Sequence, residues 1–64
     1  MKLNKLKLAL AMDNKGYNFK LLSKNCGVSR TTLSYLNNGK TCKPEILFKI
    51  AKALDVKAEE LIEQ

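Results

Sequence analysis

The sequence has no histidine and no tryptophan, and its 64 residues include only two cysteines. Without histidine, the chain lacks the side chain most often used for proton transfer near neutral pH and the commonest metal ligand. Cys26 and Cys42 do not form a Cys-x-x-Cys pair and are too few for a disulfide framework. There is also no carboxylate pair in a cleft-forming context and no glycine-rich phosphate loop. We therefore expect no enzyme activity, no catalytic residue, no metal site and no cofactor.

Long apolar runs are missing as well. The longest, Leu8 to Met12, has five residues, whereas a membrane-spanning helix needs roughly 20. The N-terminus carries no apolar signal segment, so we expect a cytoplasmic protein with no membrane partner. The apolar fraction of 45% is ordinary for a globular protein. Because no linker or repeat divides the chain, we expect one domain over residues 1–64.

Positive charge is concentrated in the first two thirds of the chain. The net charge is +6; residues 1–44 hold nine basic residues and one acidic residue, and residues 45–64 hold three and five. From Lys15 to Lys43 there are six basic residues and no acidic one, a distribution that attracts a polyanion. A solvated surface explains the charge equally well, so the positions of these residues must decide between the two.

Helical periodicity predicts an all-α fold of five helices. The first helix ends at Gly16 and takes its apolar face from a stripe of six residues: Leu3, Leu6, Leu8, Leu10, Ala11 and Met12. A fourth begins at Pro44, and its apolar residues Leu47, Ile50, Ala51 and Leu54 have the spacing of an amphipathic helix. A short last helix is expected from about Ala58 to Glu63, with Leu61 and Ile62 packing on the fourth helix or in a dimer contact.

The second and third predicted helices are short and meet at Gly27-Val28-Ser29. Asn18 can cap the second helix, and Ser29 can cap the third, which runs to about Asn37. Gly27 permits the tight turn, and Val28, Leu33 and Leu36 point inward. This arrangement is typical of a helix-turn-helix. It leaves four side chains directed away from the core: Arg30, Thr31, Ser34 and Tyr35.

Residues 18–61 resemble the Cro and phage-repressor helix-turn-helix family, also called the XRE type. The resemblance rests on four stretches: Leu22 to Ser29, Leu33 to Lys40, Pro44, and Ile50 to Leu54. It implies a bundle of the phage-repressor DNA-binding-domain type, with its third helix in the major groove. The residues it assigns to base contact are Ser29, Arg30, Thr31 and Tyr35. Expected phosphate contacts are Asn18, Lys20, Thr32, Ser34, Asn38, Lys40, Thr41 and Lys43.

Two positions depart from the family pattern. Members often have a phosphate-binding glutamine where this chain has Phe19. Many members also pair an arginine in the first helix with a glutamate late in the third, and the matching residues here are Met12 and Asn37. Loss of one partner strands a charge, whereas loss of both lets ordinary packing replace the pair. The departure is therefore compatible with the fold.

Several single residues allow two interpretations from sequence. Arg30 can bind a guanine edge or a phosphate, Tyr35 can face DNA or cover the core, and Asn18 can act purely as a cap. Cys26 is expected to be a small buried apolar residue. Cys42, in a loop, is expected to be exposed, which leaves a redox role open. The basic, leucine-rich first helix is expected to pack in the core rather than on a membrane surface.

The favoured function is a bacterial or phage transcriptional regulator that binds double-stranded operator DNA as a homodimer and represses by occupying a promoter. One recognition helix contacts few base pairs, and a two-fold dimer multiplies the discrimination. No small-molecule effector is evident. The alternative is a protein-interaction module, such as an antitoxin-like or accessory domain, with only non-specific affinity for DNA; an exposed apolar face on the third helix would favour it.

Overall fold

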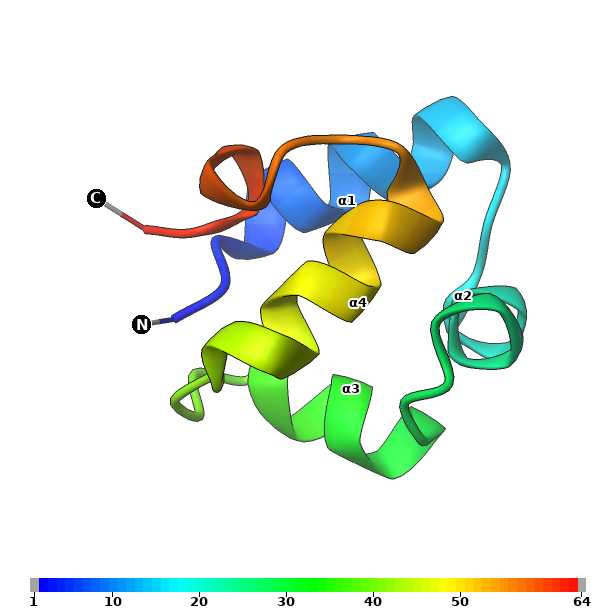
Figure 1. Cartoon of the computed structure of the whole chain (residues 1–64). Helices are drawn as coiled ribbons and strands as arrows, with labels where there is room; N and C mark the ends of the chain where they lie inside the picture. Colours follow the sequence, from blue (N-terminus) through cyan, green and yellow to red (C-terminus); the bar gives the residue numbers. More distant parts are fainter. Residues whose placement is uncertain (1, 64) are drawn as a thin grey trace.

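The computed structural model describes residues 2–63, which form four α-helices and one short 3-10 helix (Figure 1). They are α1 (Lys5–Lys15), α2 (Phe19–Cys26), α3 (Arg30–Asn37), α4 (Pro44–Leu54) and η1 (Ala58–Leu61). The expected all-helical class is confirmed, but the expected fifth helix is wrong. In its place there is a single 3-10 turn that stops at Leu61, because Ile62 has an extended backbone and bridges to Leu3.

The helix ends follow from short polar side chains and from residues in the left-handed region. Asn18 caps α2 by accepting a 2.9 Å bond from the Leu21 amide, and Ser29 caps α3 by accepting a 3.1 Å bond from the Thr32 amide. Gly16 ends α1 and Gly27 ends α2, with φ values of 70° and 75°. These four predictions from the sequence are confirmed.

The buried face of α1 differs from the expected stripe. Asn4 accepts a bond from the Lys7 amide, so the helix begins at Lys5 and leaves Leu3 outside it. The buried residues are Leu8, Ala11 and Met12, while Leu6 and Leu10 are 68% and 56% exposed. Successive residues turn by about 100° around a helix, so side chains two positions before and after Leu8 point away from the face that Leu8 buries. The assignment of Leu6 and Leu10 to the core was therefore wrong.

Helix α4 lies at the centre of the molecule and contacts α1, α2 and η1 (Figure 1). Its inner face supplies Leu47, Ile50, Ala51 and Leu54 to the core. The other large side chains with almost no exposure are Leu8, Leu22, Leu33 and Leu61. One cluster joins residues from all five helical elements, so α2 and α3 are held on a common apolar base.

The two ends of the described chain pair with each other. The Asn4 amide donates a 2.7 Å bond to the Leu61 carbonyl, and the Glu63 amide donates a 2.9 Å bond to the Lys2 carbonyl. Leu3 is thereby buried, with 3% of its surface exposed, although it belongs to no helix. Leu61 is fully buried against the same core, which excludes it from the dimer contact considered from the sequence. Within residues 2–63, no helix combines the length and apolarity needed to cross a membrane.

Candidate nucleic-acid interface

Helices α2 and α3 form a helix-turn-helix around Gly27. The Gly27 amide donates a 3.0 Å bond to the Ser23 carbonyl, and its φ of 75° reverses the chain immediately after α2. Val28, Leu33 and Leu36 are all buried, which anchors the turn and the inner face of α3. The expected inward residues of α3 are therefore confirmed, and the opposite face of the helix is fixed toward solvent.

The outward face of α3 carries the expected base-contacting side chains. Arg30 and Thr31 are exposed on its first turn, and Tyr35 is 58% exposed one turn later. Ser34 lies beside them and is half-buried. Tyr35 therefore does not serve mainly as a cover for the core, and these four residues share one surface.

Two of the expected DNA-contacting hydroxyls already have partners within the chain. The Ser29 hydroxyl caps α3 and also donates a 2.8 Å bond to the Thr32 Oγ1. This pair fixes the first turn of α3, directly beside Arg30. Asn18 has a similar local role at the start of α2, where Lys20 lies exposed. The structure therefore gives Ser29 and Asn18 capping roles whatever they contact on DNA.

The segment after α3 extends the same surface with basic and polar groups. The Asn38 amide donates to the Ser34 and Tyr35 carbonyls at the end of α3. Lys40, Thr41 and Lys43 follow and are all exposed. Thr41 also forms an antiparallel bridge with Lys2. A further lysine, distant in the sequence, therefore lies beside this segment. No pattern in the sequence indicated that contact.

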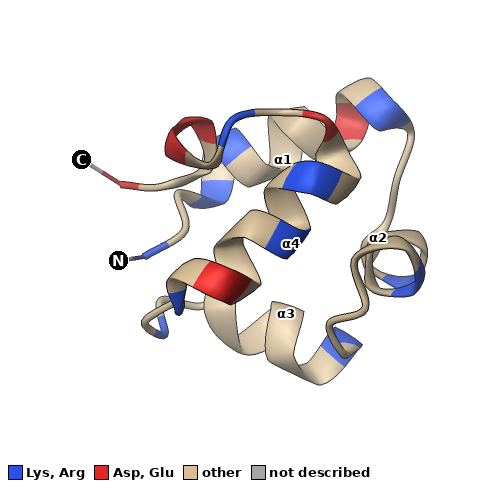
Figure 2. Cartoon of the chain, viewed as in Figure 1, with Lys and Arg blue, Asp and Glu red and all other residues tan. Residues whose placement is uncertain are grey.

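The charges are unevenly distributed over the molecule. Basic residues lie on α2, at the start of α3 and in the segment after α3, and also on α1 and α4, whereas acidic residues lie on η1, near the end of α1 and at both ends of α4 (Figure 2). Lys15, at the end of α1, pairs with an acidic residue, since its Nζ lies 3.9 Å from the Asp55 carboxylate. Glu45 is an acidic exception on the first turn of α4. Helices α2 and α3 and the segment after α3 carry basic residues and no acidic one, which suits this part of the surface to a polyanion.

Phe19, to which the sequence assigned no role, lies beside the outward face of α3. It is half-buried at the start of α2, and it lines a hollow together with Arg30, Thr31, Ser34 and Tyr35. The hollow, about 560 Å³, lies on the surface that presents the outward face of α3. The sequence indicated only that an aromatic residue occupies a position where the family resemblance leads us to expect glutamine.

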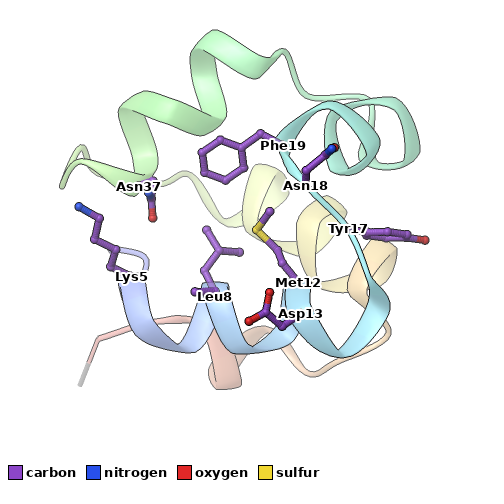
Figure 3. A pocket seen from close by; sticks show the side chains of 9 residues that line it. Lys5, Leu8, Met12, Asp13, Tyr17, Asn18, Phe19 and Asn37 are labelled. Atoms are coloured by element: carbon purple, nitrogen blue, oxygen red, sulfur yellow. The ribbon is translucent and has the colours of Figure 1, made fainter.

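A second hollow lies on the other side of Phe19, between α1 and the helix-turn-helix (Figure 3). Leu8 and Met12 approach it from α1, and Asn37 faces it from the end of α3. Its volume is about 380 Å³. Met12 and Asn37 thus face one shared space.

Cys42 is buried, with 1% of its surface exposed, so the expectation of an exposed loop cysteine was wrong. The side chain turns inward and joins the core cluster, and burial raises the pKa of its thiol. The sulfur lies 3.5 Å from the Lys43 carbonyl. Cys26 is buried as expected. Over residues 2–63, no three His, Cys, Asp or Glu side chains gather where they could hold a metal ion.

Comparison with known proteins assigns the chain to a family. Residues 7–64 match the family model of the Cro/C1-type helix-turn-helix DNA-binding domain. No curated protein matches the sequence. A solved structure described as "Phpd with cadmium complexed with hydroethylphosphonate (HEP)" superposes over 100% of this chain with a TM-score of 0.84 and 23% sequence identity. The chain spans 14% of that protein's length, and the likeness concerns the fold alone. The chain belongs to the Cro/C1-type helix-turn-helix DNA-binding family.

Proposed function

We propose that this chain is a transcriptional regulator that recognises a specific double-stranded DNA sequence with α3 and represses by occupying a promoter. The observation that carries the proposal is the outward face of α3, where Arg30, Thr31 and Tyr35 are exposed together. An arginine can bind guanine O6 and N7 with two hydrogen bonds, and a hydroxyl can bond to either groove edge. The family assignment supports the entry of this face into the major groove.

Phosphate contacts on either side of α3 would fix its position on the duplex. The proposed contacts are the start of α2, with Asn18 and Lys20, the hydroxyls of Thr32 and Ser34, and the segment after α3, with Asn38, Lys40, Thr41 and Lys43. Such contacts supply affinity and register but carry little sequence information. The proposed role of Ser29 in base recognition is chiefly indirect: its hydrogen bonds to Thr32 hold the first turn of α3 in place.

The regulator is proposed to act as a two-fold dimer on DNA. A single short recognition helix contacts few base pairs, and two copies related by a two-fold axis recognise two half-sites about 34 Å apart. Repression requires only that the bound dimer cover the promoter, and neither catalysis nor a cofactor enters the mechanism.

Selection of bound sites from a random duplex library tests the proposal. The expected result is an enriched, roughly palindromic motif with half-site centres about 10–10.5 base pairs apart. Sedimentation of the complex should give two chains per site. A promoter reporter carrying that site should lose expression when the protein is supplied. Strong binding without an enriched motif would contradict sequence-specific recognition.

The second candidate, a protein-interaction module, is favoured by one observation: α1 exposes Leu6 and Leu10. An exposed apolar helix face is suited to a protein groove. That face lies on α1 and not on α3, so the two functions can be separated by substitution. A Leu6→Gln, Leu10→Gln protein, which removes the apolar face without adding charge, should keep its DNA motif and affinity if DNA recognition is the function.

A further inference from the structure

The hollow beside α3 has an apolar wall that ordinary phosphate or base hydrogen bonding does not explain. Two of its lining residues, Phe19 and Tyr35, are aromatic, and the other three, Arg30, Thr31 and Ser34, are polar. The Phe19 ring also lines the inner hollow against α1, and it packs against the core. Phe19 therefore contributes to this surface from an anchored position.

The major groove offers only one apolar group to such a wall. Each base edge in the groove presents hydrogen-bond donors or acceptors, and thymine alone adds the C5-methyl group. A hollow with aromatic side chains on a surface that enters the groove is thus complementary to a thymine methyl. The neighbouring Arg30 remains free to bond to a guanine edge or a phosphate.

We propose that Phe19 is a specificity-determining residue, which together with Tyr35 forms the apolar wall of a hollow that receives the C5-methyl group of a thymine. The inference rests on the proposed function, because it requires α3 to lie in the major groove. It goes beyond that function by assigning a base preference to a residue outside α3. Glutamine at this position would remove the apolar wall.

Replacing thymine by uracil tests the inference, because that change removes the methyl group and leaves all base-pair hydrogen bonds in place. Each symmetric pair of thymines in the selected site is replaced in turn, and the dissociation constant is measured by fluorescence anisotropy. Burying one methyl group corresponds to an affinity change of about fourfold per half-site, or about fifteenfold for the pair. We expect one thymine pair to show this loss with the unmodified protein.

Variants of the two aromatic residues complete the test. Phe19→Ala and Tyr35→Ser should each reduce the uracil penalty at that thymine pair to less than about twofold. Tyr35 is 58% exposed, so its variant keeps the core intact even if Phe19→Ala unfolds. Phe48→Ala is the matched control: Phe48 is an aromatic residue on α4 with 62% exposure, outside the hollow, and its variant should keep the full penalty.

Two results would overturn the inference while leaving the proposed function intact. One is a selected motif in which no thymine pair is sensitive to uracil. The other is a sensitive pair whose penalty is unchanged in both the Phe19 and the Tyr35 variants. Failure of the proposed function is distinguishable from both, since no motif would be enriched at the selection step, before any uracil is introduced.

Discussion

The Ser29 cap gives a prediction whose size can be worked from the structure. The Ser29 hydroxyl accepts a 3.1 Å bond from the Thr32 amide and donates a 2.8 Å bond to the Thr32 side chain. Ser29 is exposed, so its truncation to alanine opens no cavity and removes only these two hydrogen bonds. Replacing a capping serine by alanine typically costs about 1 kcal/mol of unfolding free energy. In a domain of this size, that corresponds to a fall of about 4–8 °C in melting temperature.

The matched control is Ser29→Asn, which keeps a capping oxygen without adding a negative charge near DNA. Thermal and denaturant unfolding followed by circular dichroism should place Ser29→Ala about 1 kcal/mol below the unmodified protein and Ser29→Asn within a few tenths of it. Equal stability of the alanine variant, or equal destabilisation by both changes, would refute the capping argument. A stable Ser29→Asn protein with an altered DNA motif would instead assign Ser29 a direct base contact.

Three further predictions concern other parts of the surface and core. Met12 and Asn37 face one hollow. The unfolding free energy of the double variant Met12→Arg, Asn37→Glu should therefore exceed the value expected by adding the effects of the two single variants, by about 0.5–3 kcal/mol, measured by denaturant unfolding. Simple additivity of the two effects would contradict this. Lys40→Ala and Lys43→Ala should each lower the magnitude of the slope of log affinity against log salt by about 2, one unit for each copy in the dimer, without altering the preferred motif; an unchanged slope would exclude a phosphate contact. Because burial raises the pKa of the Cys42 thiol, the folded protein should resist alkylation near neutral pH. Its unfolding free energy should fall as pH rises past the thiol's ordinary pKa, since the unfolded chain ionises first; the Cys42→Ala variant should lose this pH dependence, and rapid labelling of the native protein would contradict burial.

The helix-turn-helix could be predicted from the sequence because its features are local. Asn18 and Ser29 cap helices through bonds that span three residues, and Gly27 adopts a backbone conformation that glycine favours. Each depends on residue type and short spacing alone. The outward position of Arg30 and Tyr35 follows from the same periodicity once Leu33 and Leu36 are fixed inward.

The errors have a different origin, because they depend on contacts between distant parts of the chain. Leucine spacing alone allows two faces for α1, and the cap at Asn4 together with the pairing of Leu3 and Ile62 decides between them. Cys42 was placed outside the core because it lies in a loop, although its side chain turns inward. The hollow beside Phe19 also forms between residues of two helices. No short-range pattern contains that information.

The measurement that tests the central claim most directly is site selection with the Arg30→Ala variant beside the unmodified protein. Lys57→Ala is the matched control, because Lys57 is exposed just before η1, away from α3, and the substitution removes the same charge. We predict that Arg30→Ala relaxes base preference at one symmetric position, at a cost of about 1–3 kcal/mol, while Lys57→Ala keeps the full motif. An unchanged motif with Arg30→Ala, or the same loss of affinity in both variants, would contradict base recognition by Arg30 on α3.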